Sequence, residues 1–275
     1  MSTATVTAAD INKLRQATGA GMMDCRKALT ESNNDFEAAI DWLRKQGQKV
    51  AAKRSDREAK EGVVIAKTTP DHKAGIVLCI SCETDFVSKN ADFVAFAQSI
   101  ADAAISNNVK SAEELNAVEI NGAKVSDMIN DKLASIGEKI EIQKFERIEA
   151  PFVASYIHGA NRMGVLVGMN KEAADAGKDV AMQIAAMNPL AIDESAIDPA
   201  TIAREKDIAI EQIKAEGKPA EMAEKIALGK VNKFLKDNTL LAQPFVKDNA
   251  KSVGDYLKAT DADLKLTEFK RVALG

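Results

Sequence analysis

Apolar residues recur at helical spacing in three short stretches within the first 55 residues of the chain. Residues 19–21 and 33–35 interrupt this spacing, and Thr7 followed by Asp10 has the pattern of a capping box before the first stretch. The apolar positions are Ile11 and Leu14, then Met22, Cys25 and Leu29, then Phe36, Ala39, Ile40 and Leu43. The pattern predicts that residues 1–55 form a small three-helix bundle, a shape that suits a binding module.

The stretch at residues 45–60 is polar and mostly basic, with Lys49, Lys53, Arg54 and Arg57. Two interpretations are open: a contact to nucleic acid, or a solvated helix end followed by a linker. The second is favoured because no aromatic residues lie between these charges to stack on bases.

Short β-branched runs at residues 62–67 and 75–81 predict a β-hairpin, because Thr69, Pro70, Asp71 and His72 between them are turn residues. We expect His72 to be exposed at the tip of this hairpin. Asn90 then caps a predicted helix that ends at about residue 106. A further helix is predicted at residues 125–136, and residues 140–148 alternate as a strand.

The same order of elements recurs after residue 150, which indicates a duplicated subdomain. Residues 153–158 and 164–169 form a second predicted hairpin around a turn at 159–161, and a helix follows at residues 179–187. The closing strands, 140–148 and 264–272, share a Phe-x-Arg-hydrophobic pattern at Phe145–Arg147 and Phe269–Arg271. We therefore predict an α+β fold with a duplicated core of antiparallel sheets. Residues 56–150 form one subdomain, and residues 151–198 with 236–275 form the other.

Residues 199–235 interrupt the second subdomain and predict a helical hairpin. Gly217, Lys218 and Pro219 end one arm and start the next. The apolar seam is expected at Ile202, Ala209 and Ile213 on the first arm and at Met222, Ile226 and Phe234 on the second. Each arm is about 25 Å long, so a projecting antiparallel coiled coil is the natural form. Its tip is a candidate contact site, and a spacer packed on the core is the alternative.

The composition narrows the classes of partner and compartment. The chain has 275 residues, 46% hydrophobic and 28% charged, with a net charge of −4. Such a charge gives no electrostatic drive towards nucleic acid or acidic membranes, and an aromatic content of 4% disfavours a base-stacking surface. No apolar run is long enough to span a membrane, and residues 1–10 have no signal-peptide pattern. Three cysteines favour a reducing compartment, so we expect a cytoplasmic protein.

Cys79 and Cys82 form a Cys-x-x-Cys pair, for which zinc binding or redox chemistry are possible interpretations. Zinc would require further ligands, and His72 and His158 are the two histidines of the chain. In a strand, residues three apart point to opposite faces, which favours two buried thiols instead. The sequence has no nucleophile elbow, no phosphate loop and no cluster of metal ligands. We therefore expect no enzyme activity, no cofactor and no metal site.

The stretch Thr84-Asp85-Phe86-Val87 lies at the junction between a predicted strand and a predicted helix. A loop phenylalanine is either buried in its own core or inserted into a partner, and residue type alone favours burial. The corresponding junction of the second repeat passes through residues 170–172, which are polar. A motif that is needed only for folding should be present in both repeats. The asymmetry therefore favours an exposed Phe86 that waits for a partner.

Two long runs resemble the signatures of the elongation factor Ts family: residues 14–29 and residues 83–89. Residues 156–159, 217–219 and 243–246 are similar as well, so the resemblance covers nearly the whole chain. It implies a ubiquitin-associated-like N-terminal docking domain. It also implies a guanine nucleotide exchange factor that binds elongation factor Tu with GDP and promotes GDP release in translation elongation. A passive or chaperone-like partner of elongation factor Tu, without exchange activity, is the alternative.

The resemblance implies roles for seven residues. Phe86 would be inserted between helices of the partner, and Asp85 would disturb its Mg²⁺ site, while Thr84 and Val87 shape the motif. Met22 and Met23 would dock on a partner helix. His158 would touch the partner, or it is a turn histidine with a local hydrogen bond.

The sequence also departs from the family. Cys79 and Ser81 replace a Glu and an Asn, so hydrogen bonding below the motif is expected to differ. The sequence ends at Gly275, so a C-terminal helix that contacts the partner in some relatives is expected to be missing. The helical hairpin contacts either the partner or a second copy of the chain, as a homodimer.

Overall fold

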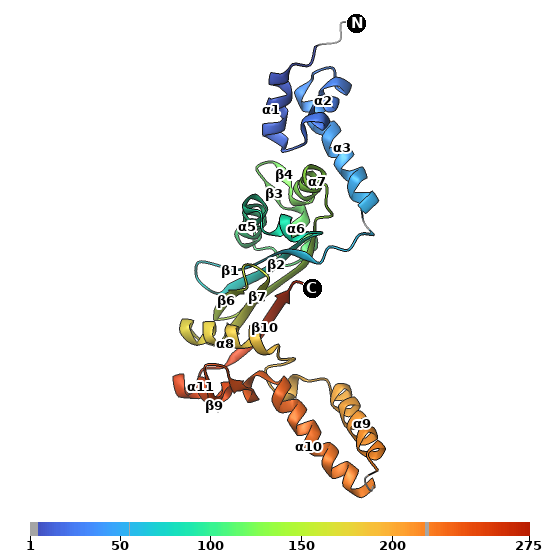
Figure 1. Cartoon of the computed structure of the whole chain (residues 1–275). Coiled ribbons are helices and arrows are strands. Elements are labelled where there is room, and N and C mark those ends of the chain that lie inside the picture. The colour runs from blue at the N-terminus through green and yellow to red at the C-terminus, as the bar shows by residue number, and fades with distance from the viewer. Residues whose placement is uncertain (1–4, 55, 218–219) are drawn as a thin grey trace.

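The computed structural model describes residues 5–54, 56–217 and 220–275. A helical module lies at one end, two β-sheets with their helices form the middle, and a helical hairpin projects at the other end (Figure 1). The predicted α+β class with antiparallel sheets is confirmed. None of the helices in these described ranges is both long and apolar enough to cross a membrane.

The N-terminal module consists of α1 (Ala8–Thr18), α2 (Met22–Glu31) and α3 (Phe36–Arg54). Thr7 and Asp10 form the predicted capping box, and Gly19 ends α1 with a φ of 69°. Five residues form the buried centre of the bundle: Leu14, Cys25, Ala28, Leu29 and Ala39.

Helix α3 is longer than the sequence pattern predicted and reaches into the stretch interpreted as a helix end and linker. Its second half packs against α7 (Val125–Ile136). A Cβ placed on Gly47 would come 3.2 Å from the backbone oxygen of Asn130, and Val50 packs against the core of the first repeat. A continuous helix therefore joins the module to the core. The predicted domain boundary at residue 55 lies outside the described residues.

The first repeat is a three-stranded antiparallel sheet in the order β1-β2-β5. Its strands are β1 (Glu61–Thr68), β2 (Ala74–Cys82) and β5 (Glu141–Glu149). Helices α5 (Ala91–Ser106) and α7 pack on one face of this sheet. No sequence pattern predicted the short elements α6 (Ala112–Ala117), β3 (Glu119–Ile120) and β4 (Ala123–Lys124).

The second repeat has the equivalent order β6-β7-β10, with β6 (Phe152–His158), β7 (Met163–Met169) and β10 (Leu266–Ala273). Helices α8 (Ala174–Met187) and α11 (Val253–Thr260) cover its outer face. Two short 3-10 turns, Glu194–Ala196 and Leu240–Ala242, and a small ribbon of β8 (Pro244–Phe245) and β9 (Asp248–Ser252) complete it. Leu78 pairs with Phe145 in the first sheet, and Val167 pairs with Phe269 in the second. The shared register confirms the duplication.

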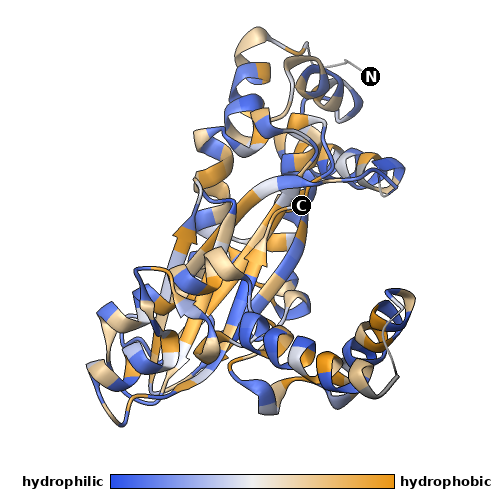
Figure 2. Ribbon diagram, turned by 60° about the horizontal axis from the view of Figure 1, so that its bottom comes forward, coloured by the Kyte–Doolittle hydropathy of each residue, from blue (hydrophilic) through white to orange (hydrophobic). Residues whose placement is uncertain are grey.

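The two sheets pack face to face, so the layers follow one another as helices, sheet, sheet, helices (Figure 1). Figure 2 shows hydrophobic residues concentrated in these central strands. The interface between the sheets is formed by Val64, Val77, Cys79, Ile148, Val153, Leu166 and Val272. Gly75 and Gly164 occupy equivalent positions in the repeats. A Cβ on Gly75 would lie 2.9 Å from Val153, and one on Gly164 would lie 2.8 Å from Val77, so each glycine permits close approach of the other sheet.

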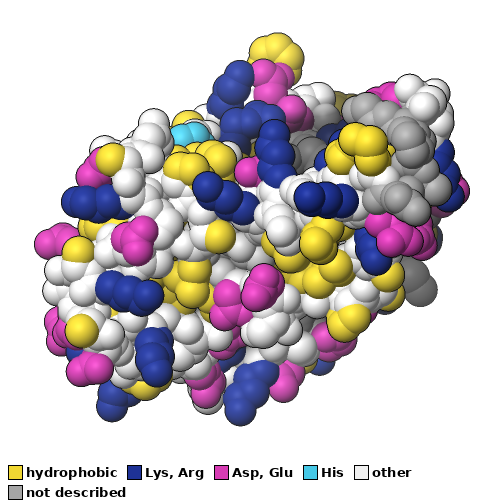
Figure 3. All heavy atoms as spheres, turned by 90° about the horizontal axis from the view of Figure 1, so that it is seen from below, with side chains coloured by type: hydrophobic (Ala, Val, Ile, Leu, Met, Phe, Trp, Pro, Cys, Tyr) yellow, Lys and Arg dark blue, Asp and Glu magenta, His cyan; other side chains and the backbone are white. Residues whose placement is uncertain are grey.

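The helical hairpin consists of α9 (Pro199–Ala215) and α10 (Ala220–Asn238). Ala209 and Ile213 lie in the seam as predicted, and the second arm contributes Ala223 and Ala227. Met222 was predicted in the seam, but 55% of it is exposed, because the small residue Ala223 takes the inward position. Of the predicted turn, Lys218 and Pro219 lie outside the described residues. Seen from the hairpin end, the surface carries small hydrophobic patches among charges of both signs (Figure 3).

The buried residues of the hairpin form a cluster of their own, distinct from the cores of both repeats. We predict that replacing residues 199–235 with a short Gly-Ser link leaves the main unfolding transition of the core within a few degrees of its original temperature, because few core contacts are lost. Differential scanning calorimetry of both proteins measures this. Loss of the main transition would show instead that the hairpin is part of the cooperative core.

Candidate functional site

The motif predicted as a loop forms a single helical turn between strand and helix. Strand β2 ends at Cys82, Thr84 is extended with φ −125° and ψ 155°, and α4 spans Asp85–Ser88. Asn90 then caps α5 by accepting hydrogen bonds from the backbone N–H groups of Asp92 and Phe93. Because α4 and α5 begin only six positions apart, at Asp85 and Ala91, this turn is short. We call residues 84–88 the Phe86 turn.

Phe86 is 84% exposed, more than any other large hydrophobic residue of the described chain. Its neighbour Val87 is half-buried and packs against the core of the first repeat. Leaving a phenylalanine in water rather than burying it forgoes about 1.5–3 kcal/mol. The predicted exposure of Phe86 is therefore confirmed, and its side chain contributes little to the stability of the fold.

Asp85 begins the turn and pairs with Lys89, with 2.6 Å between the carboxylate and Nζ. Hydrogen bonding and the charge of Lys89 lower the pKa of Asp85 below its usual range, so its carboxylate is ionised near neutral pH. Both side chains are exposed, and such surface pairs contribute little to stability. Another cation can therefore compete with Lys89 for Asp85 at small cost.

Two glutamates that the sequence analysis did not select hold the base of the turn. The carboxylate of Glu138 accepts hydrogen bonds from the backbone N–H groups of Glu83 and Thr84 at 3.1 and 3.0 Å, and from the Thr84 hydroxyl at 2.6 Å. The carboxylate of Glu83 in turn accepts the backbone N–H of Lys139 at 2.6 Å. We call this reciprocal pair the Glu83–Glu138 clasp.

Arg54 and Arg57, which the sequence pattern placed in a solvated stretch, also bind Glu83, at 3.2 and 3.0 Å. Burial alone would raise the pKa of Glu83, but the N–H of Lys139 and the two guanidinium groups outweigh it and lower the pKa below the ordinary value of 4.5. Because the pKa is lowered in the folded protein, the ionised Glu83 carboxylate stabilises the fold fully at pH values above its ordinary pKa. The contribution is lost as the pH falls through the lower pKa of the folded protein.

Cys79 and Ser81, which replace the expected family residues, are buried on the same side of β2. The Cys79 thiol donates to Gln143, and the Ser81 hydroxyl donates to the backbone oxygen of Glu141, so both bond to β5. Cys79 contacts the second sheet, whereas Cys82 lies in the helix-covered core, so the predicted opposite orientation is confirmed. Burial raises the pKa of Cys79 to about 11 and that of Cys82 to about 12, so neither is a reactive thiolate near neutral pH.

The remaining predicted contact residues lie outside the Phe86 turn. Met22 and Met23 begin α2 in the N-terminal module and are 54% and 71% exposed. His158 is exposed at the end of β6, where its Nδ1 lies 3.0 Å from the Tyr156 hydroxyl. The methionines and His158 therefore belong to different parts of the molecule from the Phe86 turn.

The turn that follows His158 nevertheless lies at the same end of the sheets as the Phe86 turn. Arg162 binds Glu61 at 3.1 Å, and Glu61 pairs with Cys82 at the end of β2. The backbone oxygen of Asn161 also accepts the N–H of Val64 on β1. The turn after His158 is therefore bonded to β1, the neighbour of the strand that leads into the Phe86 turn.

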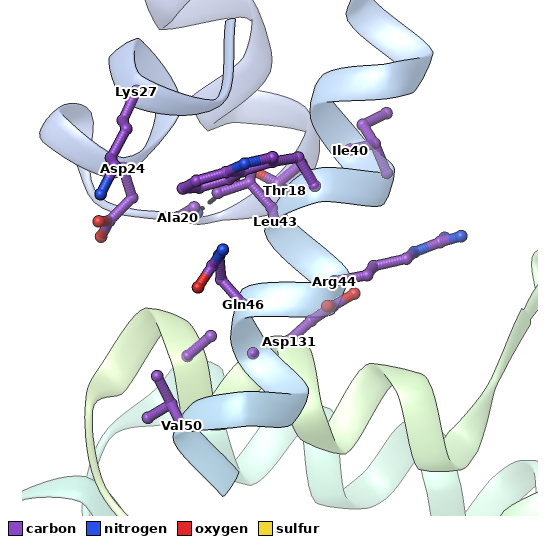
Figure 4. Close-up of a pocket in the computed structure, with 13 residues that line it drawn as sticks. Thr18, Ala20, Asp24, Lys27, Ile40, Leu43, Arg44, Gln46, Val50 and Asp131 are labelled. Carbon is purple, nitrogen blue, oxygen red and sulfur yellow. Dashed lines mark hydrogen bonds between the residues drawn. The ribbon is translucent and has the colours of Figure 1, made fainter. Parts of the chain in front are cut away.

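A pocket of about 200 Å³, which no sequence pattern predicted, lies between the N-terminal module and α7. Figure 4 shows Gln46 and Val50 of α3 above α7, with Arg44 and Asp131 at one side. The Nε atom of Arg44 is buried without a hydrogen-bond partner, and burial raises the pKa of Asp131. The polar side chains of this junction therefore have fewer hydrogen-bond partners than those of the Glu83–Glu138 clasp.

Comparison with known proteins identifies the family. The family model described as Elongation factor TS matches residues 83–275, and the one described as Elongation factor Ts, mitochondrial, N-terminal matches residues 1–51. The chain belongs to the elongation factor Ts family. Elongation factor Ts of Christiangramia forsetii is 50% identical over 275 residues, which cover 99% of this chain and 100% of the relative.

Two further elongation factor Ts proteins extend this comparison. That of Flavobacterium psychrophilum is also 50% identical, over 99% of the chain and 100% of the relative. That of Cytophaga hutchinsonii is 48% identical, over 98% of the chain and 99% of the relative. Membership of the elongation factor Ts family implies a role in translation elongation.

Proposed function

We propose that the protein is a guanine nucleotide exchange factor, which binds elongation factor Tu with GDP and promotes GDP release. The observation that carries this proposal is Phe86, 84% exposed on a turn whose base is fixed by six hydrogen bonds or ion pairs to Glu83 and Glu138. A rigidly held, exposed aromatic residue is an anchor for a pocket on a partner.

The proposed mechanism uses two neighbouring side chains of this turn. Phe86 enters between helices of the nucleotide domain of elongation factor Tu, and the gain from burying its ring drives the displacement of those helices. The Asp85 carboxylate, ionised and paired with an exposed lysine, comes near the Mg²⁺ site and disturbs its coordination. The affinities of elongation factor Tu for this protein and for GDP are then linked reciprocally, because each ligand weakens the binding of the other.

Other contacts supply the binding energy that this displacement requires. Met22 and Met23 are flexible, exposed apolar side chains that can adapt to a partner helix. His158 is a further contact, oriented by its hydrogen bond to Tyr156. The protein works in the cytoplasm, breaks no covalent bond of a substrate and needs no cofactor. The helical hairpin is a second docking element, for elongation factor Tu or for another copy of the chain.

The test is stopped-flow release of fluorescently labelled GDP from elongation factor Tu, with and without this protein. We expect the release rate to rise with the concentration of the protein and to reach a plateau, because release follows formation of a complex with the nucleotide still bound. Chelation of Mg²⁺ should reduce the difference between the two conditions, since part of the proposed action is then already complete. A complex that forms without faster GDP release would identify a passive binding partner instead.

A further inference from the structure

Within the Phe86 turn, Val87 packs on the core of the first repeat, but the Phe86 ring itself is held by little of the fold. A four-residue helix has little stability of its own, because the first turn of a helix is costly to form. Asp85 has an exposed partner, and Phe86 has hardly any contact with the fold. The bonds made by the residues directly before the turn therefore add a constraint that the turn does not supply by itself.

The Glu83–Glu138 clasp bonds the main chain directly before the turn. Glu138 follows Gly137, which ends α7 in the left-handed region with φ 82°, and Lys139 leads into β5. Glu83 follows β2, the neighbour of β5 in the sheet. Each carboxylate thus accepts backbone N–H groups from the other segment, so the two segments are joined in both directions.

The clasp bonds the main chain at the two residues before α4. The Glu83 and Thr84 N–H groups point at one oxygen of Glu138, and the Thr84 hydroxyl binds the other. Hydrogen bonds to an ionised acceptor are stronger than those between neutral groups. Arg54 of α3 and Arg57 bind the same clasp through Glu83, so the end of the helix that carries the N-terminal module is attached here too.

We propose that Glu138 is a positioning residue, which holds the Phe86 turn in one orientation and thereby allows Phe86 to act on the nucleotide site of the partner. The functional part of this inference rests on the proposed exchange activity. The structural part concerns the free protein alone, and the two can be tested separately.

The first experiment measures amide hydrogen exchange of residues 83–90 in the full chain without a partner. We expect Glu138→Ala to reduce protection of these amides at least about tenfold, because the two clasp N–H groups lose their acceptor. Glu138→Gln should stay within about threefold of the original protein, since its amide oxygen accepts both N–H groups and its NH₂ can donate to the Thr84 hydroxyl. Unchanged protection in Glu138→Ala would overturn the proposal.

The second experiment measures release of labelled GDP from elongation factor Tu by the same variants. Glu138→Ala should lower the rate at saturation about tenfold or more and change the half-saturating concentration much less, because Met22, Met23 and His158 still dock. Glu138→Gln should restore most of the rate. The matched control is Glu146→Ala, a carboxylate on β5 that pairs with Lys270 of the second repeat. It should leave both parameters unchanged.

The outcomes separate the inference from the proposed function. If the original protein does not accelerate GDP release, the proposed function is wrong, and the hydrogen-exchange result still decides whether the clasp holds the turn. If the original protein does accelerate release and Glu138→Ala matches it at saturation, Glu138 does not position Phe86 and the inference is overturned.

Discussion

Phe86→Ala is expected to lose most of the exchange activity and to keep the stability of the parent protein. Truncating a buried anchor at an interface costs about 2 kcal/mol or more, which corresponds to roughly a thirtyfold loss. The side chain contributes little to the fold because 84% of it is exposed. Stopped-flow GDP release measures the first effect, and thermal unfolding, with a shift of at most a few degrees, measures the second.

Phe93 is the matched control, because it is the same residue type seven positions further along, in α5, and is only 1% exposed. Phe93→Ala should destabilise the fold by about 3–5 kcal/mol through loss of buried area and formation of a cavity. The two substitutions should therefore have opposite effects: Phe86→Ala lowers exchange activity and leaves stability unchanged, whereas Phe93→Ala lowers stability. A Phe86→Ala protein that unfolds early but exchanges nucleotide normally would contradict this assignment.

Gly164→Ala is expected to destabilise the core by about 1–3 kcal/mol, the usual cost of overpacking. The new Cβ would lie 2.8 Å from a methyl group of Val77 and 2.9 Å from one of Val64, both in the opposite sheet. These valines are fully buried in the interface between the sheets and have little room to move. The midpoint of urea unfolding should fall accordingly, and Gly75→Ala should behave alike because it occupies the equivalent position.

Gly229→Ala is the control for the glycine substitutions. Gly229 lies in α10, and apart from its chain neighbours and the backbone of its own helix no atom lies within 4 Å of the position of a new Cβ. Alanine favours a helix interior by roughly 0.5–1 kcal/mol over glycine, so this variant should stabilise the hairpin slightly or have no visible effect on the core. Equal losses of stability at Gly164 and Gly229 would show that packing between the sheets is not the cause.

The sequence predicted the order of the main elements because each has a local signal. Helix starts at Thr7 and Asn90 carry side-chain caps, and the strands of both hairpins are β-branched runs around turn residues. The end of α3 was missed because tertiary contacts with α7 extend a helix that polar residues alone would not sustain. Met222 was misplaced because helical spacing alone does not distinguish it from the adjacent Ala223 as the inward residue.

The motif around Phe86 could be selected from the sequence, but the residues that hold its base, Glu83 and Glu138, could not. The absence of an equivalent motif in the second repeat was a signal that required only the alignment of the two repeats. Glu138 lies 55 residues from Glu83 and 54 from Thr84, and no periodicity links such distant positions. Arg54 and Arg57 gave a misleading signal, because a basic stretch without aromatic residues looks the same whether its charges are solvated or bound to Glu83.

The pairing of the two sheets has a consequence for synthesis on the ribosome. The first repeat is complete at Glu149, but the face formed by Val64, Val77 and Ile148 is covered only by strands made later. Strands β6 and β7 follow directly and cover much of this face, whereas β10, which contacts β2 and β5, is the last strand of the chain. At about 5–20 residues per second, roughly 10 s pass between the synthesis of Glu149 and that of β10, so the part of the face under β10 is covered last. The first repeat therefore reaches its full set of apolar contacts only when the last strand of the second repeat is in place.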